Sequence, residues 1–137
     1  MLVFDFVNEQ LENGRFIARP KIKVTLIGKK ASMTFLAILD SGADITIIPR
    51  SIADFLGIMY DFKSVQRFLD FSKNTHQCAP GSVDVHFEGN ISSEEIIDVP
   101  VLVALSGEEY EPVLGCDKIF DNFKITFDKR QKILLEK

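Results

Sequence analysis

The chain has 137 residues, of which 46% are hydrophobic and 26% are charged, and its formal net charge at pH 7 is -4. These values exclude a disordered chain and a strongly charged polyelectrolyte, and they are typical of one globular domain. They give no indication of a nucleic-acid partner. We therefore expect a single domain over residues 1–137.

Runs of β-branched and aromatic residues, bounded by turn residues, dominate the chain and predict an all-β fold. Strands are expected near residues 2–6, 15–27, 32–39, 45–48, 63–70, 81–88, 94–104, 122–127 and 131–135. The segments LIGKKAS, residues 26–32, and DKRQK, residues 128–132, predict hairpin turns between neighbouring strands.

Two short helices are expected to interrupt the strands. The segment PRSIADFLG, residues 49–57, begins with Pro49, which suits the first turn of a helix. It ends with Gly57, which suits a C-terminal cap. The segment CDKIFDN, residues 116–122, allows a second short helix.

No apolar segment approaches the length of a membrane span, and the first residues lack the features of a secretory signal. We therefore expect a cytoplasmic protein without a membrane partner. The two cysteines, Cys78 and Cys116, are expected to remain thiols in a reducing compartment. His76, Cys78 and His86 do not form a convincing set of zinc ligands, so no metal and no other cofactor is predicted.

The segment AILDSGADITIIP, residues 37–49, places one carboxylate, Asp40, between two apolar runs. A surface turn explains an isolated Asp-Ser-Gly, because Asp and Ser bond their own backbone and Gly adopts unusual dihedral angles. The apolar flanks favour partial burial, where an ionised carboxylate is costly unless specific partners hold it. Later, PVLGCDKIF, residues 112–120, leads from an apolar pair and a glycine into the second expected helix.

With DSGA and VLG in this order and spacing, the chain resembles the retropepsin family, the dimeric aspartic proteases of retroviral type. The resemblance runs from about Val24 to Phe127. It implies a closed β-barrel of the acid protease fold, with one or two short helices and one lobe per chain. In such a fold Gly115, which has no side chain, lets its strand pass close to the active-site loop.

The resemblance implies an aspartic-type endopeptidase, a hydrolase that cleaves peptide bonds without a metal. Two carboxylates placed about 3 Å apart share one proton, so that one acts as a base and the other as an acid. Because the chain supplies only one Asp-Ser-Gly, the implied enzyme is a homodimer with one Asp40 from each chain. The expected partners are therefore a second copy of the chain and a polypeptide substrate.

Residues that match the family motifs take their implied roles from the resemblance. Asp40 is the implied acid and base, Ser41 forms a hydrogen bond across the dimer axis, and Gly42 brings its backbone close to the carboxylate and the substrate. Contacts with the substrate are implied for Ala43, Asp44, Ile45, Ile47, Leu69, Phe71, Tyr110, Val113 and Leu114. For Asp44, a role in a turn or a cap is an open alternative.

Two segments depart from the family pattern. Cys116 follows the second glycine, where the family often has an arginine that pairs with an acid near the active-site loop. The family's flap, a mobile hairpin that closes over the substrate, often has a glycine at its tip, but residues 64–80 contain none. Phe68, Leu69 or Phe71 is expected to cover the cleft instead. Such a flap is expected to open and close less freely.

Two alternatives stay open at this point. A chain that keeps DSGA but alters its flap can serve as a catalytically weak or inactive dimerisation or peptide-binding module of the same fold. The other alternative is a small β domain in which Asp-Ser-Gly is an ordinary turn.

Overall fold

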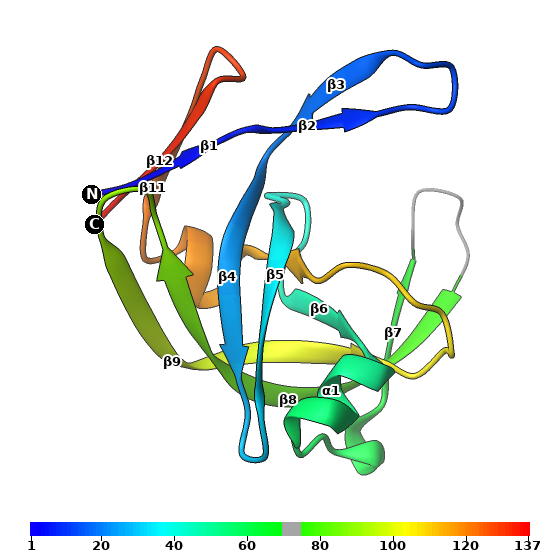
Figure 1. Ribbon diagram of the computed structural model, residues 1–137. Coiled ribbons are helices and arrows are strands. Elements are labelled where there is room, and N and C mark those ends of the chain that lie inside the picture. Colours follow the sequence, from blue (N-terminus) through cyan, green and yellow to red (C-terminus); the bar gives the residue numbers. More distant parts are fainter. Residues whose placement is uncertain (70–74) are drawn as a thin grey trace.

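The computed structural model describes residues 1–69 and 75–137, and it is mostly β (Figure 1). The strands are β1 (Leu2–Asp5), β2 (Val7–Gln10), β3 (Phe16–Arg19), β4 (Lys21–Ile27), β5 (Ser32–Leu39), β6 (Thr46–Pro49), β7 (Gln66–Leu69), β8 (Thr75–Glu88), β9 (Ser93–Ala104), β10 (Val113–Leu114), β11 (Lys124–Asp128) and β12 (Lys132–Glu136). The helical segments are α1 (Arg50–Leu56), η1 (Phe62–Ser64) and η2 (Cys116–Phe120). Within the described ranges, no helix is long and apolar enough to cross a membrane.

The largest sheet contains seven strands in the order β4-β5-β10-β6-β9-β8-β7, and β4 also pairs with β8. The pairings therefore lead from β4 through β5, β10, β6, β9 and β8 back to β4. Two of them are parallel, between β5 and β10 and between β6 and β9. The short strand β10 thus lies between the two strands that flank residues 40–45.

Both chain ends lie together in a three-stranded sheet of order β1-β12-β11 (Figure 1). The predicted hairpin at residues 128–132 is confirmed, because β11 and β12 pair antiparallel on either side of a tight turn. Lys129 and Arg130 hold this turn with φ values of 51° and 55°. Positive φ at two successive central residues is the geometry of the turn that matches the twist of a hairpin.

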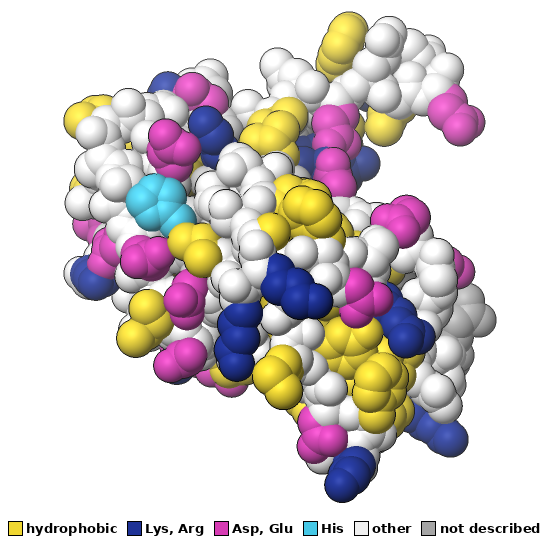
Figure 2. All heavy atoms as spheres, turned by 60° about the horizontal axis from the view of Figure 1, so that its bottom comes forward, with side chains coloured by type: hydrophobic (Ala, Val, Ile, Leu, Met, Phe, Trp, Pro, Cys, Tyr) yellow, Lys and Arg dark blue, Asp and Glu magenta, His cyan; other side chains and the backbone are white. Residues whose placement is uncertain are grey.

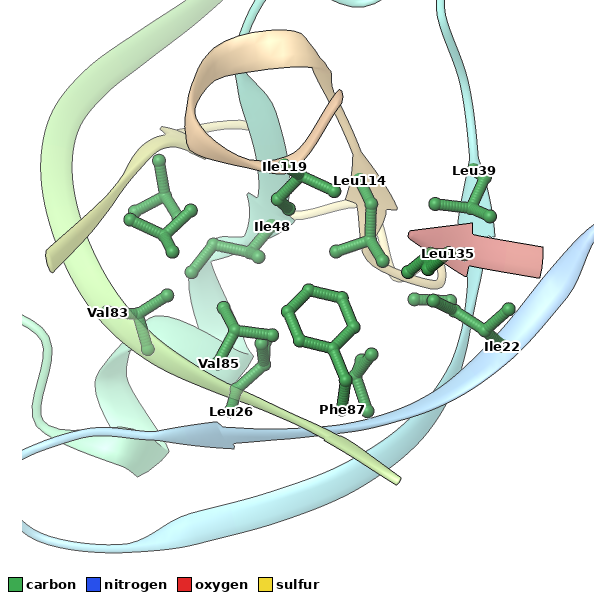
Figure 3. Close-up of a cluster of buried hydrophobic side chains, with 14 of the residues drawn as sticks. Ile22, Leu26, Leu39, Ile48, Val83, Val85, Phe87, Leu114, Ile119 and Leu135 are labelled. Atoms are coloured by element: carbon green, nitrogen blue, oxygen red, sulfur yellow. The ribbon is translucent and has the colours of Figure 1, made fainter. Parts of the chain in front are cut away.

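Alternate residues of β4 and β8 point into one hydrophobic core (Figure 3). These inward residues are Ile22, Val24, Leu26, Val83, Val85 and Phe87. Each such side chain contributes about 1.5–3 kcal/mol when it is fully buried. Leu39 and Ile48 belong to the same core, so the chain is anchored both before and after the loop that carries Asp40.

The helix expected over residues 49–57 is confirmed as α1. Pro49 is its extended N-cap residue, and Gly57 caps its C-terminus with a φ of 76°. The second expected helix, over residues 116–122, is only in part helical. Within η2, Asp117 is extended and Lys118 has a φ of 62°, so the chain makes a kinked turn there instead of a regular helix.

Three strand predictions differ from the structure. The strand expected over residues 15–27 is divided at Pro20, which has no N–H to donate to a ladder, into β3 and β4. The strand expected over 63–70 begins with the 3-10 helix η1, and among its described residues Gln66–Leu69 form β7. The strand expected over 81–88 begins earlier, at Thr75, and continues through Pro80 and Gly81.

Candidate active site

The loop between β5 and β6 holds Asp40 at a half-buried position. The Asp40 backbone N–H donates a hydrogen bond to the carbonyl oxygen of Leu114 at 3.0 Å. The Ala43 N–H donates to the Asp40 carbonyl oxygen at 3.1 Å, which closes the turn. β10 therefore fixes the backbone of Asp40, so the position of the carboxylate depends on a segment from the other end of the chain.

The side chain of Asp40 is held within the same turn. Its Oδ1 accepts a hydrogen bond from the Gly42 N–H at 2.9 Å. A Cβ atom at Gly42 would lie 3.1 Å from that oxygen, which is tighter than most side-chain contacts. The structure thus brings the Gly42 backbone against the carboxylate, as the resemblance implied, and a contact of Gly42 with substrate stays a prediction.

Gly115 passes the other side of the loop at very close range. A Cβ atom there would lie 2.6 Å from the Ile45 carbonyl carbon and 2.8 Å from the Ala43 carbonyl oxygen. Its N–H donates to the buried Thr46 hydroxyl at 3.1 Å. Only glycine fits between these backbone atoms, so the expected close approach of the VLG segment is confirmed.

Cys116 extends the contact between the two segments. Its N–H donates to the Ala43 carbonyl oxygen at 2.8 Å, and its thiol donates to the Ser41 carbonyl oxygen at 3.3 Å. Partial burial raises the pKa of this thiol, and the nearby carboxylates of Asp121, Asp44 and Asp40 act in the same direction. The cysteine thus supports the loop by hydrogen bonds from its thiol and its backbone. The Ser41 residue itself is exposed.

A cavity of about 330 Å³ opens beside this loop. It is lined by Gly42, Ala43, Asp44, Ile45, Ile47, Gln66, Arg67 and Leu102. The loop and β6 supply the first five residues, β7 supplies two, and β9 supplies the last. Four residues with an implied substrate contact, from Ala43 to Ile47, therefore line one cavity.

Sequence reasoning missed Gln66, Arg67 and Leu102. The two β7 residues fall in the segment expected to cover the cleft. The charge of Arg67 within that segment could have indicated that this residue faces the cavity. Leu102 had no such signal, because it lies within the continuous apolar run of β9 and looks like any other core residue.

The remaining implied substrate contacts fall in different surroundings. Tyr110 packs with Ile45 and Ile47 against a small buried cluster that includes Cys78. Burial raises the pKa of Tyr110 to about 12, and the charges of Cys78 and Glu108 add to the shift. Burial alone raises the pKa of Cys78 to about 11. Tyr110 therefore packs against the same buried cluster as Ile45 and Ile47, but it is not among the residues that line the cavity.

Val113 pairs with Ile38 on one side and with Ile47 on the other, so it connects the two strands that flank the loop. Leu114 is fully buried in the main core, behind the loop and away from the cavity lining. Leu69 is the last residue of β7. Phe71 lies outside the described residues.

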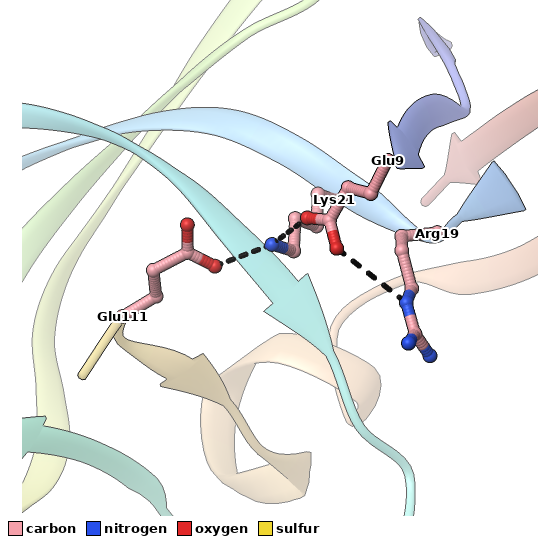
Figure 4. A network of polar contacts seen from close by, with 4 residues as sticks. All are labelled: Glu9, Arg19, Lys21 and Glu111. Atoms are coloured by element: carbon pink, nitrogen blue, oxygen red, sulfur yellow. Dashed lines mark hydrogen bonds and ion pairs between the residues drawn. The ribbon is translucent and has the colours of Figure 1, made fainter. Parts of the chain in front are cut away.

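Charged residues join the loop before β10 to the first part of the chain (Figure 4). The Lys21 ammonium group contacts the carboxylates of Glu9 and Glu111, and the Arg19 guanidinium lies 3.6 Å from Glu9. Lys21 is only 9% exposed. Burial lowers the pKa of Lys21, but its hydrogen bonds to Glu111 and Glu9 and their charges outweigh that effect and raise it.

Another acid of this loop, Glu109, accepts a hydrogen bond from the Ser51 hydroxyl at 2.9 Å, which ties the loop to α1. Among residues 1–69 and 75–137, no group of three or more histidine, cysteine or acidic side chains is arranged to hold a metal ion. The chemistry available at the site is that of a carboxylate beside a cavity lined by both apolar and polar side chains.

No protein-family model matches this chain, and no curated protein matches it. Among solved structures, a retropepsin-like aspartic protease from Rickettsia conorii is similar to this chain, with a TM-score of 0.54. The two are 18% identical, and the match covers 97% of this chain and 90% of that chain. The likeness shows that this mostly β chain has a fold similar to that of a retropepsin-like aspartic protease.

Proposed function

We propose that the protein is a homodimeric aspartic endopeptidase, in which water is activated by two Asp40 carboxylates, one from each chain. The observation that carries this proposal is the bracing of the Asp40 loop by Leu114 and Gly115, beside a cavity of about 330 Å³. An ordinary surface turn needs neither feature. The fold similarity to an aspartic protease supports the same conclusion.

The pairings from β4 around to β8 and back to β4 support the closed barrel of this fold, with one lobe in each chain. One lobe supplies one Asp40, and a second copy related by a two-fold axis supplies the other. Ser41 is exposed beside Asp40, as a hydroxyl contact across that axis requires.

The proposed reaction needs one ionised and one protonated Asp40, a state that two carboxylates about 3 Å apart adopt because both cannot ionise. The ionised carboxylate takes a proton from water as the water oxygen attacks the carbonyl carbon of the substrate. The protonated carboxylate gives its proton to the carbonyl oxygen. The tetrahedral intermediate then breaks its C–N bond, and the leaving amine takes up the proton that the dyad took from water. As the C=O bond re-forms, a hydroxyl group of the intermediate gives its proton to the other carboxylate, which restores the singly protonated dyad.

The substrate in this proposal is an extended polypeptide that pairs with the β7–β8 hairpin, so that alternate side chains face the enzyme. One of them enters the cavity above Ile45, Ile47 and Leu102. These apolar residues favour a large hydrophobic side chain next to the cleaved bond.

The decisive experiment compares wild type with Asp40→Asn, and uses Asp128→Asn, an exposed position in the terminal hairpin, as the matched control. Cleavage of an unfolded protein should be strongest at acidic pH, insensitive to chelators and inhibited by pepstatin. Asp40→Asn should abolish cleavage but keep the dimer, whereas the control should cleave normally.

Mixing the variants tests the shared site. Wild type mixed with excess Asp40→Asn should lose more activity than its dilution explains, because heterodimers have only half of the acid-base pair. A loss strictly proportional to the wild-type fraction after full subunit exchange would contradict the shared site. A wild-type dimer that cleaves nothing would instead identify the chain as a dimerisation or peptide-binding module.

A further inference from the structure

A hairpin near the start of the chain stands clear of the rest of the molecule (Figures 1 and 2). We call residues 7–19 the arm; they comprise β2, its turn and β3. The two strands pair with each other and, within the described part of the chain, with no other strand. Because an isolated two-stranded hairpin is only marginally stable in water, a projecting arm of this kind calls for a stabilising contact.

The arm is nevertheless a well-formed element. In its turn, the Leu11 N–H donates to the Arg15 carbonyl oxygen at 2.7 Å, and the Gly14 N–H donates to the Leu11 carbonyl oxygen at 2.9 Å. Gly14 adopts a φ of 84°, which glycine adopts without strain. At its base, Lys21 joins Glu9 to Glu111. The direction in which the arm projects is therefore tied to the loop before β10.

The far end of the arm carries apolar side chains that the single chain leaves in water. Phe16 is 69% exposed and Leu11 is 38% exposed. Full burial of a phenylalanine side chain is worth about 1.5–3 kcal/mol, so contact with a partner is favourable.

A second copy of this chain is the partner that the proposed active site requires near the arm. The proposed dyad needs another Asp40 about 3 Å away, so the second chain must approach the end of β5. The arm projects beyond that same end of β5 (Figure 1). The Lys21–Glu111 contact also links its base to the segment that braces Asp40.

We propose that the arm of each chain packs Phe16 and Leu11 on the other chain and so strengthens the dimer that completes the active site. This inference rests on the proposed function, because the position of the second chain follows from the need for its Asp40 in the active site. Two-fold symmetry makes the contact occur twice per dimer, so one substitution removes two contacts. The arm itself contributes no group to the reaction.

Sedimentation equilibrium of the full chain tests the proposal through the dimer dissociation constant. Phe16→Asp should raise this constant about 100-fold, since each of the two contacts loses about a factor of ten, or about 1.4 kcal/mol. Phe55→Asp is the matched control. Phe55 is 54% exposed on α1, at the end of the molecule opposite the arm, and its substitution should leave the constant unchanged.

Activity provides the second measurement. At concentrations high enough to restore the dimer, Phe16→Asp should recover the wild-type activity per dimer. An unchanged dissociation constant for Phe16→Asp, in a wild type that dimerises and cleaves, would overturn the role of the arm and leave the proposed function intact. A wild type that neither dimerises nor cleaves would overturn the proposed function, and the arm contact with it.

Discussion

The backbone N–H of Gly115 donates a hydrogen bond to the hydroxyl of Thr46 at 3.1 Å, between positions 69 residues apart in the chain. Thr46 is fully buried. The bond lies where the VLG segment crosses the start of β6, so it joins the residue after β10 to the strand that follows the Asp40 loop. A buried N–H that loses its acceptor costs about 1–3 kcal/mol.

Replacement of this acceptor should therefore destabilise the protein. Thr46→Val keeps the shape of the side chain but leaves the Gly115 N–H unpaired, and we expect a loss of about 1–3 kcal/mol in the free energy of unfolding. Urea unfolding at one fixed protein concentration measures it. The control is Thr34→Val, at an exposed site on β5, which should change stability by less than about 0.5 kcal/mol. Equal losses in both variants would contradict the prediction.

A methyl group at Gly115 should damage the site more severely. Gly115→Ala places a Cβ atom within 3 Å of backbone atoms of Ala43 and Ile45, which cannot rotate away as a side chain can. We expect a loss of about 3 kcal/mol and of cleavage. Gly107→Ala is the control, because a Cβ atom there meets nothing within 4 Å. Normal stability of Gly115→Ala would show that the loop is not tightly braced.

The two thiols should react at different rates. Cys78 is fully buried, and its pKa of about 11 leaves little thiolate at pH 8. Cys116 is partly exposed, so N-ethylmaleimide should modify it first, break its contact with the Ser41 carbonyl oxygen and abolish cleavage. Cys116→Ser keeps a hydrogen-bond donor and should cleave normally in the presence of the reagent. Full activity after modification of Cys116 in the wild type would contradict this role.

The ion pairs at the base of the arm should make stability depend on pH. The hydrogen bond and charge of Lys21 hold the pKa of Glu9 below its ordinary value of 4.5. Because the folded-state pKa is the lower one, the stabilising effect is complete above about pH 4.5 and is lost as the pH falls through the folded-state value.

We therefore expect Glu9→Gln to unfold at lower urea concentration than wild type at pH 7, and the difference to close below about pH 4.5. Glu12→Gln, at an exposed position in the turn of the same arm, is the control. It should unfold at the same urea concentration as wild type both at pH 7 and below about pH 4.5. A difference in stability between Glu9→Gln and wild type that does not change with pH would contradict a stabilising ion pair between Glu9 and Lys21.

Arg67 should influence which side chain enters the cavity. The residue lines the cavity from β7, and its guanidinium attracts acidic groups and repels basic ones. Arg67→Glu should shift the preference of the enzyme toward a basic side chain by about tenfold in relative kcat/KM, or about 1.4 kcal/mol. A peptide library measures the shift. Lys63→Glu, on η1 and outside the cavity lining, should leave the profile unchanged.

The elements predicted correctly from the sequence are those that neighbouring residues determine. Pro49 and Gly57 delimit α1 because each acts through its own dihedral angles. The strand β10 was not predicted, because two residues become extended only when β5 and β6 lie on either side of them. The early start of β8 was missed for a related reason: Pro80 reads as a strand breaker, yet its pairing with Leu102 continues the ladder.

The candidate site shows the same division. Asp40, Gly42 and Gly115 were predicted because they belong to the short motifs DSGA and VLG, which can be recognised within a few neighbouring residues. The cavity wall was predicted only where it continues the Asp40 loop. Arg67 and Leu102 join it because β7 and β9 cross nearby, and pairings between distant strands leave no pattern in a single segment.

The position of β10 also determines when the loop that carries Asp40 can form during synthesis. Val113 completes the ladder between Ile38 and Ile47, and the Asp40 N–H has its acceptor on Leu114. While a ribosome has released only the first hundred residues, that acceptor does not exist, and the nascent loop lacks its brace. Contacts so far apart in the chain form slowly. The loop that carries Asp40 can therefore gain this brace only after Leu114 has left the ribosome.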